Sequence, residues 1–333
     1  MCGRQVIVGP RWLLMELSVA ARPADVAPAS ASRRSLLAEW RGHWVMLALI
    51  APGFLYFLVF QYIPLLGYVI AFEDYLPFLG FFASPWVGLQ NFAGLFGDRN
   101  FWSAVQNTLL FAALQLLLFF PAPIALALLL NSLLSGNLRR FVQSVVYLPH
   151  FISWVIIVAL FQQMLGGSGL VASWTRGVGL PGLDIMTNPD AFKWLITAEL
   201  IWKETGWGTI IYLAALLTID VSLYEAAAVD GAGAWARLWH ITVPGLIGIT
   251  ILLLVLRLGQ ILSVGFEQIL LQREFVGAPA AEVLDTYVYF RGVVGGQWGV
   301  TAAAGLIKGL VGAMMVIAAN SLAHRFGQTG LFE

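Results

Sequence analysis

The chain has 333 residues, of which 59% are hydrophobic and 11% are charged, and its formal net charge is zero. Soluble domains carry roughly 25% charged residues, so a chain of this composition, with a mean hydropathy of +0.82, would aggregate in water. The absence of a basic patch argues against a nucleic-acid partner, and the single cysteine, Cys2, excludes an intrachain disulfide.

The N-terminal residues 1–40 differ from the rest of the chain. They are rich in Ala, Pro and Ser, with scattered arginines, and they contain no signal-peptide pattern ending in a small-residue cleavage site. We expect residues 1–40 to form a cytoplasmic, partly disordered tail. Residues 41–333 then form a transmembrane domain.

Six segments of this domain are long enough to cross the roughly 30 Å hydrocarbon core of a membrane, which needs about 20 apolar residues in a helix. In chain order they are residues 44–71, 107–133, 142–165, 196–219, 245–270 and 300–323. The runs lack the alternation of barrel strands, and only helices or closed barrels satisfy the backbone in lipid. We therefore predict an all-α polytopic membrane protein with about six transmembrane helices, bent where prolines fall within the spans: Pro52, Pro64, Pro121, Pro123 and Pro149.

The distribution of Lys and Arg predicts the orientation of these spans. With the N-terminus in the cytoplasm, ten basic residues fall on cytoplasmic segments, five on the opposite side and three within spans. Because cytoplasmic loops carry the excess of basic residues, we predict that both termini are cytoplasmic. The polar break at 220–244 is then cytoplasmic too, and 73–106, 166–194 and 271–299 are outer loops.

The break between the fourth and fifth spans carries Glu225-Ala226-Ala227, followed by Gly231, Ile241 and Pro244. Ser222 and Glu225 have the spacing of a capping box, which predicts about two turns of helix over 223–230, roughly 12 Å long. The alanines would let a partner approach the helix backbone, and Gly231 or Gly233 would supply a left-handed cap. An EAA triplet alone favours an ordinary surface helix, but the full spacing favours a contact helix.

This spacing, E-A-A-x3-G-x9-I-x-[L/V]-P, resembles the signature of the permease subunits of binding-protein-dependent ABC importers, with Val243 where leucine is usual. The resemblance implies a coupling helix at 222–233 that docks into a cleft of an ATPase subunit. The residues that match this helix and are expected to contact the ATPase are Tyr224, Glu225, Ala226, Ala227, Asp230 and Gly231.

Further stretches narrow the resemblance to LplB-type permeases, a branch of the type I, maltose-type importers. These are residues 107–109 (NTL), 147–153 (YLPHFIS), 202–207 (WKETGW) and 224–233 (YEAAAVDGAG). Permeases for aldouronate and alginate oligosaccharides belong to this branch, and the chain is most similar to the alginate permease. The resemblance covers the chain from about residue 40 onward and implies the type I importer permease fold.

The resemblance also implies the partners of the chain. These are a second homologous permease, two ATPase subunits that bind ATP and Mg²⁺, and a soluble periplasmic or extracellular binding protein that delivers an oligosaccharide. The machine would lie in the bacterial inner membrane. The chain itself would carry no cofactor, no metal and no catalytic residue.

Ionisable residues inside spans usually face other protein or a watery cavity. Lys203, Glu204, Arg257 and Lys308 are candidates for the substrate pathway, and Glu267 lies near the outer end of the predicted fifth span. One interpretation is structural: Glu204 or Glu267 pairs with Arg257 or Lys308, and Lys308 packs within the G-x-x-x-G pair of residues 305 and 309. The other places them on the path, where the surplus positive charge would suit an acidic sugar. His150 is expected to be a hydrogen-bonded structural residue.

Enzyme functions are disfavoured because the chain has no G-x-x-x-x-G-K-[ST] phosphate loop, no H-E-x-x-H motif and no nucleophile elbow. We expect ATP hydrolysis on separate subunits. The alternatives are the same machine serving a neutral oligosaccharide, an ATP-independent secondary transporter, or a purely structural membrane subunit. A secondary transporter typically has internal repeats, which are not evident here, and neither it nor a structural subunit accounts for the EAA spacing.

Overall fold

The computed structural model describes residues 44–133 and 135–325, so the predicted N-terminal tail lies outside the described residues. The chain divides into two compact units, Met1–Ile63 and Pro64–Glu333. Within the described residues the secondary structure is helical, with one isolated bridge between Glu73 and Trp86 and no β-strand. The predicted all-α class is confirmed.

The described part of the first unit is one apolar helix. It consists of α2 (Trp44–Phe57), the π-helical turn η1 (Leu58–Tyr62) and the first residue of α3 (Ile63–Leu65). No residue of α2 is buried within the chain. A helix that is apolar all round is typical of a membrane span.

Five helices of the described residues are long and apolar enough to cross a membrane: Trp44–Phe72, Arg99–Ser132, Trp154–Gly177, Ala234–Gly259 and Trp298–Arg325. A sixth span results if α10 (Pro189–Leu216) and α11 (Val221–Val229), which meet at an angle of 70°, are counted together. The prediction of about six spans is therefore confirmed in number.

Two predicted spans have the wrong boundaries. The third, 142–165, is broken into α7 (Gly136–Tyr147), the 3-10 turn η4 (Leu148–Phe151) and α8 (Trp154–Leu165), because Pro149 cannot continue a helical hydrogen-bond ladder. The fifth, 245–270, ends with α13 (Val243–Gly259). A new helix, α14 (Phe266–Val276), follows Gly265, whose φ of +85° lies in the left-handed region that favours glycine.

Three π-helical turns each end two residues before a proline. These are η1 before Pro64, η3 (Gln115–Phe119) before Pro121, and η5 (Leu238–Thr242) before Pro244. A proline ring clashes with the carbonyl four residues earlier, and a π turn holds one extra residue that moves this carbonyl aside. In η3 the amide of Phe120 donates instead to the Gln115 carbonyl at 2.9 Å. At Pro64 and Pro121, two of the predicted bends, the proline is therefore accommodated within a continuous helix.

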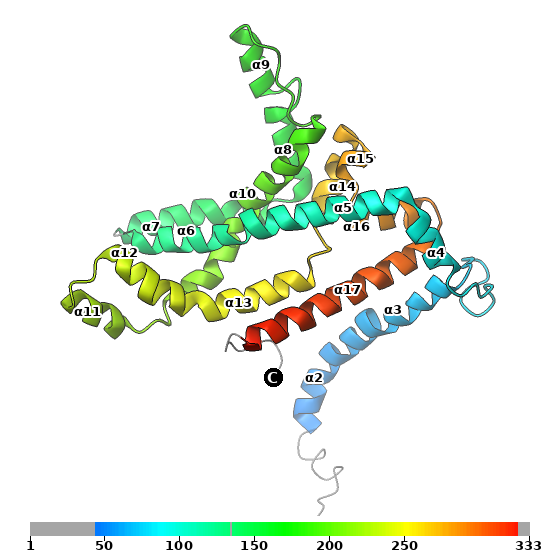
Figure 1. The fold of residues 1–333 in the computed structure, drawn as a ribbon, viewed down its shortest axis with the longest axis horizontal. Coiled ribbons are helices and arrows are strands. Elements are labelled where there is room, and N and C mark those ends of the chain that lie inside the picture. Colours follow the sequence, from blue (N-terminus) through cyan, green and yellow to red (C-terminus); the bar gives the residue numbers. More distant parts are fainter. Residues whose placement is uncertain (1–43, 134, 326–333) are drawn as a thin grey trace, which may run out of the picture. The chain divides into compact units, whose positions relative to one another are not determined.

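The second unit is built around the long helix α10, which packs against α6 (Pro121–Ser132), as α13 packs against α17 (Trp298–Arg325) (Figure 1). The cluster at the α6–α10 contact contains Ala127, Leu130 and Tyr212. Gly206 lets α10 approach the end of α7 so closely that a methyl group there would overlap the Val146 carbonyl oxygen.

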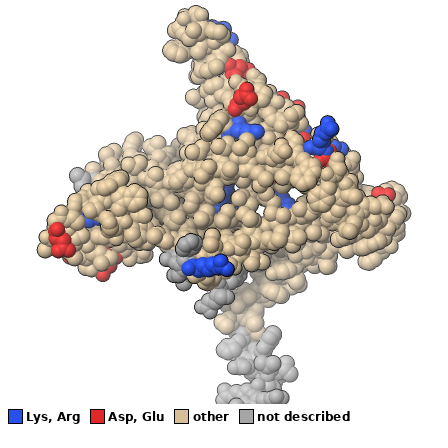
Figure 2. Space-filling model, viewed as in Figure 1, with Lys and Arg blue, Asp and Glu red and all other residues tan. Residues whose placement is uncertain are grey.

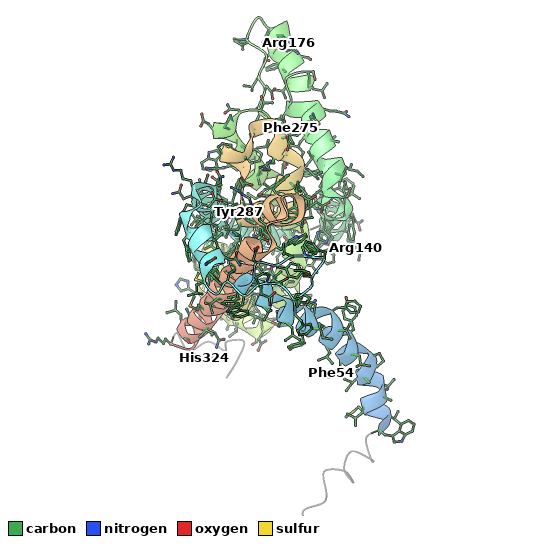
Figure 3. The ribbon with its side chains drawn as sticks, turned by 90° about the vertical axis from the view of Figure 1, so that its right-hand side faces the viewer. Phe54, Arg140, Arg176, Phe275, Tyr287 and His324 are labelled. Carbon is green, nitrogen blue, oxygen red and sulfur yellow. The ribbon has the colours of Figure 1, made fainter. Side chains whose placement is uncertain are left out.

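Residues 266–294, predicted mostly as an outer loop, instead form a packed helical segment. It contains α14, α15 (Ala278–Ala281), α16 (Leu284–Val288) and the π-helical turn η6 (Tyr289–Val294). Tyr287 of α16 is 1% exposed and lies in the middle of the helices, whereas α9 (Leu170–Gly177), which carries Arg176, projects away from them (Figure 3). The segment 271–299 is therefore largely helical rather than an irregular loop, and its outer position stays a prediction.

Candidate functional site

The predicted contact helix is α11, which lies at one end of the second unit together with α12 (Ala234–Arg237) (Figure 1). It begins at Val221 because the Asp220 side chain accepts a hydrogen bond from the Ser222 amide at 2.9 Å. This hydrogen bond lowers the pKa of Asp220. The predicted capping box of Ser222 and Glu225 was wrong, because Asp220 takes the cap position and moves both residues inside the helix.

The C-terminal end of α11 is closed as predicted by a left-handed glycine. Gly231 has a φ of +76°. The Gly231 amide donates to the Ala228 carbonyl at 3.1 Å, and the Ala232 amide donates to the Ala227 carbonyl at 2.8 Å. This pair of bonds is the Schellman motif, which satisfies carbonyls at the helix end. The helix is therefore a short unit with both ends defined.

The surface of α11 is exposed and largely apolar. It has no buried residue, and Val229 is 89% exposed. Glu225 has no ion pair or side-chain hydrogen bond within the described part of the chain. The face drawn in Figure 2 carries acidic side chains at the end where Figure 1 places α11.

One side chain links α11 to the following helix. The Tyr224 hydroxyl lies 2.9 Å from the Thr242 hydroxyl in η5. Beside this contact a groove of about 720 Å³ is lined by residues of α6, α11, α12 and η5. Because η5 leads into α13, this contact connects α11 to a helix that is long and apolar enough to cross a membrane.

Of the four predicted pathway residues, Lys203 is held by backbone. Its ammonium donates to the carbonyls of His150 and Ile152, both at 2.7 Å, and of Pro149 at 3.3 Å. These carbonyls belong to the break between α7 and α8. Lys203 is 5% exposed, and its Nζ atom lies 3.7 Å from Glu204 Oε1. The ammonium therefore supplies the donors that these carbonyls lose where the helix is interrupted.

Glu204 lies on the other side of the same break. Its Oε2 atom is 2.7 Å from His150 Nδ1, and the His150 ring stacks on Trp207 with centroids 4.4 Å apart and an interplanar angle of 4°. The prediction that His150 is a hydrogen-bonded residue is confirmed. The predicted pairing of Glu204 with Arg257 or Lys308 was wrong, because the Glu204 carboxylate pairs with the His150 ring instead.

Arg257 has no carboxylate within ion-pair distance among residues 44–133 and 135–325. Its guanidinium donates to Gln115 Oε1, in the π turn η3, and lies 5.6 Å from the centroid of the Phe119 ring. Gln115 is 2% exposed. Glu267, the other proposed partner, lies in α14 rather than in a span and forms no ion pair within the described residues.

Lys308 forms an ion pair with Asp285 of α16, and the side chains of both residues are 22% exposed. The structural interpretation predicted an ion pair at Lys308 but not this partner. The sequence prediction does not include Asp285, because it assigns residues 271–299 to an outer loop. A signal was available in the mostly apolar stretch 283–290 (VLDTYVYF), in which Asp285 is the one acidic residue and which the structure forms into a helix.

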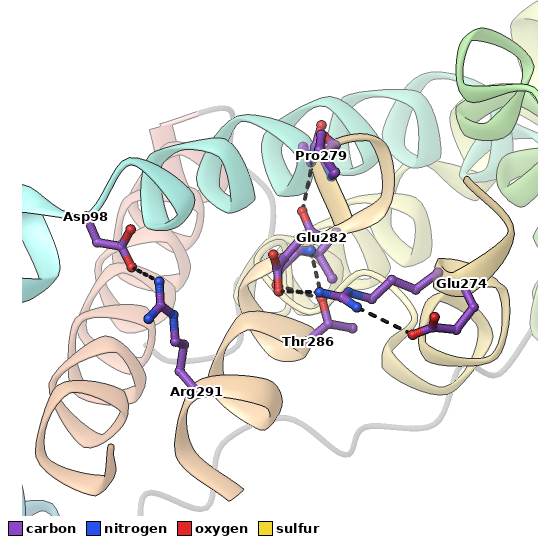
Figure 4. A network of polar contacts seen from close by, with 9 residues as sticks. Asp98, Glu274, Pro279, Glu282, Thr286 and Arg291 are labelled. Atoms are coloured by element: carbon purple, nitrogen blue, oxygen red, sulfur yellow. Dashed lines mark hydrogen bonds and ion pairs between the residues drawn. The ribbon is translucent and has the colours of Figure 1, made fainter. Parts of the chain in front are cut away.

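A network of polar side chains fixes the segment 266–294 to α5 (Arg99–Leu114) and its cap (Figure 4). Arg291 and the Tyr287 hydroxyl both donate to Asp98 Oδ2 at 2.9 Å. Burial, together with the neighbouring Asp98, raises the pKa of Tyr287, so its hydroxyl remains a donor. The Arg273 guanidinium lies 3.4 Å from Glu282 and 4.0 Å from the centroid of the Phe290 ring.

The same segment is attached to α10 and α5 by buried hydrogen bonds. The amides of Gln268 and Gln272 donate to Glu199 Oε2 at 2.8 and 2.6 Å. The Asn107 amide donates to the carbonyls of Pro279 and Glu282 at 3.1 and 3.0 Å. Sequence reasoning missed Glu199, because a lone acid in a span does not reveal its neutral partners about 70 residues away.

The helix α10 meets the capped, exposed helix α11 at 70°, and the described residues contain five further helices long and apolar enough to cross a membrane. These features define a polytopic membrane protein. Residues 120–328 match the family of the binding-protein-dependent transport system inner membrane component. The chain belongs to this family, the permease subunits of ABC transporters, and is LplB-like.

Two proteins of Bacillus subtilis (strain 168) are similar over nearly their whole length. Protein LplB is 42% identical over 319 residues, which cover 96% of this chain and 100% of LplB. The polygalacturonan/rhamnogalacturonan transport system permease protein YteP is 42% identical over 301 residues, which cover 90% of this chain and 94% of YteP.

A solved structure has the same fold. The crystal structure of a bacterial alginate ABC transporter in complex with an alginate pentasaccharide-bound periplasmic protein contains a chain that is 37% identical, with a TM-score of 0.82. The match covers 89% of this chain and 99% of that chain. The predicted importer permease fold is confirmed.

Proposed function

We propose that the chain is the transmembrane permease subunit of an ATP-driven importer that takes up acidic oligosaccharides delivered by a soluble binding protein. The similar proteins support this class of substrate. YteP is named for polygalacturonan and rhamnogalacturonan, and a matching structure, with a TM-score of 0.81, is of an importer of the acidic polysaccharide alginate.

The proposed assembly contains a second homologous permease and two ATPase subunits, which bind ATP and Mg²⁺. This chain supplies one side of the pathway and no nucleotide site, consistent with the lack of a phosphate-loop motif in its sequence. The transmembrane domain, 41–333, lies in the bacterial inner membrane with both termini in the cytoplasm. The tail, 1–40, is cytoplasmic.

The observation that carries the proposal is the geometry of α11. A helix of nine residues, capped at both ends and exposed along its length, fits a role as a rigid projection pressed by the ATPase. The contact residues are Tyr224, Glu225, Ala226, Ala227, Asp230 and Gly231. Closure of the ATPase dimer on ATP would displace α11, and the contact between Tyr224 and Thr242 would transmit this displacement to α13.

The substrate pathway is proposed to include Glu204, Arg257 and Lys308. Arg257 contributes a positive charge without a carboxylate partner in the described residues, which suits an anionic sugar. Lys203 would support the path indirectly, because its ammonium holds the turn that carries His150.

The test uses Glu225→Cys in a Cys2→Ser background, reconstituted with its permease, ATPase and binding-protein partners. We expect a crosslink from position 225 to a cysteine in the ATPase cleft, and ATP-dependent uptake of an alginate trisaccharide that is lost without the ATPase. Asp74→Cys is the matched control, because Asp74 is exposed in a predicted outer loop. Uptake without ATP, or an equal crosslink from position 74, would contradict the proposal.

A further inference from the structure

A cavity of about 490 Å³ lies within the second unit, between η2 (Leu66–Phe72), the end of α13, α16 and α17. Its volume falls in the range of small-ligand sites, roughly 300–1,000 Å³. Apolar side chains, among them Leu262, Val288 and Val316, form part of the wall. The cavity is therefore large enough to hold a sugar ring.

The polar groups of the cavity are few. Lys308 and Asp285 line it as an ion pair, and the side chains of Tyr68 and Ser263 line it as well. The hydroxyls of Tyr68 and Ser263 have no hydrogen-bond partner in the part of the chain that the structure describes. An ammonium has three donors and a carboxylate accepts through both oxygens, so the pair retains capacity for further hydrogen bonds.

The position of this pair favours a ligand over simple packing. Lys308 lies ten residues after Trp298, so it is roughly 15 Å along the membrane-spanning helix α17. Ionisable residues at such depth usually face protein or a watery cavity and mark substrate paths. Lys308 faces a cavity.

The glycines of α17 divide into two kinds. A methyl group at Gly305 would lie 3.3 Å from the Tyr68 ring, and one at Gly312 would lie 3.1 Å from the Gly259 carbonyl oxygen. These two glycines are needed for packing within the chain. A methyl group at Gly309 would meet no atom within 4 Å, although Gly309 lines the cavity, so its small size keeps the cavity open.

We propose that this cavity is a subsite for one pyranose ring of the transported oligosaccharide. Asp285 and Lys308 bind ring hydroxyls as acceptor and donor, Ser263 adds a further hydrogen bond, and the Tyr68 ring contacts the sugar face. The inference rests on the proposed function and adds to it a binding site and the groups that recognise the sugar.

The first test changes the volume of the cavity. We expect Gly309→Leu to lower ATP-dependent uptake of an alginate trisaccharide at least tenfold in the reconstituted importer, because the side chain fills the cavity. Ala318→Leu, the matched control, adds a leucine at an exposed position of α17 that does not line the cavity, and it should retain uptake within twofold of wild type. Assembly with the partner subunits and thermal melting are measured for both variants. A correctly assembled Gly309→Leu importer with wild-type uptake would overturn the proposal.

The second test separates recognition from structural pairing. The exchange variant Lys308→Asp/Asp285→Lys restores an ion pair with the charges reversed. If the pair binds sugar, uptake should stay at least tenfold below wild type although the subunit assembles. Wild-type uptake by the exchange variant would show that only the pairing matters. If this variant fails to assemble, the comparison of Gly309→Leu with Ala318→Leu still decides.

The wild-type importer separates the two proposals. If it shows no ATP-dependent uptake of the trisaccharide, the proposed function fails. If the wild-type importer transports the sugar and Gly309→Leu does not lower uptake, only the proposal of a sugar subsite is rejected.

Discussion

Three backbone carbonyls at the break between α7 and α8 converge on the ammonium of Lys203. The sequence identifies Lys203 as a charge inside a span. It does not reveal this role, because the partners are main-chain atoms more than 50 residues away whose release depends on Pro149. Hydropathy can locate such a residue but cannot say which groups surround it.

We expect Lys203→Met to destabilise the subunit by about 1–3 kcal/mol, the penalty for leaving buried polar groups unsatisfied. The midpoint of thermal unfolding in detergent should fall accordingly. Lys193→Met, at a lysine of α10 whose side chain makes no hydrogen bond or ion pair in the described residues, should leave the midpoint unchanged. Equal midpoints for the two variants would argue against the structural role of Lys203.

The packing of α10 against α7 depends on Gly206 having no side chain. The methyl group of Gly206→Ala would overlap the Val146 carbonyl oxygen, so α10 and α7 must separate. Overpacking of this kind costs about 1–3 kcal/mol, and we expect a lower unfolding midpoint. Gly309→Ala, also within a long helix but with no atom near the new methyl group, should keep or raise the midpoint. A stable Gly206→Ala subunit would mean that the helices can move apart freely.

At the scale of elements, the hydrophobic pattern predicted the existence of the spans better than their ends. The first, second and sixth spans lie close to 44–71, 107–133 and 300–323. The third and fifth failed because hydropathy averages over a break of a few residues. Pro149 and Gly265 marked these breaks and were outweighed by the apolar residues around them.

The contact helix α11 shows the same limit on a smaller scale. The EAA spacing located it, and Gly231 located its end. Its start was wrong because the spacing of Ser222 and Glu225 predicted a capping box, whereas Asp220 provides the cap. Asp220 was decisive because its carboxylate accepts a hydrogen bond from the Ser222 amide.

One carboxylate, that of Asp98, attaches the C-terminal part of the segment 266–294 to the start of α5. Asp98→Asn keeps the oxygen that caps α5 through Asn100 but removes the negative charge that Arg291 and Tyr287 share. We expect a loss of about 1–2 kcal/mol, seen as faster hydrogen exchange in α16 and η6. Asp74→Asn is the control, because the Asp74 carboxylate forms no hydrogen bond or ion pair in the described residues. Unchanged exchange in α16 would place its attachment elsewhere.

At the scale of the whole molecule, the orientation in the membrane remains a prediction from basic residues. It can be tested with single cysteines in a Cys2→Ser background. We expect Asn137→Cys, between α6 and Arg139, to react with a membrane-impermeant thiol reagent only in inverted vesicles. Asp74→Cys should react on intact cells. The reverse pattern would place α11 outside and remove any possibility of contact with an ATPase.

The π turns before Pro64, Pro121 and Pro244 have a consequence for insertions and deletions. Each turn absorbs its additional residue locally, so the helix faces before and after it stay in phase. Removing one residue within 115–119 should leave α5 and α6 facing their present neighbours, at the cost of a clash at Pro121. Removing one residue from the middle of α6 should instead rotate all that follows by about 100° and turn Leu130 away from α10. Length variation between related chains should therefore concentrate at these three turns.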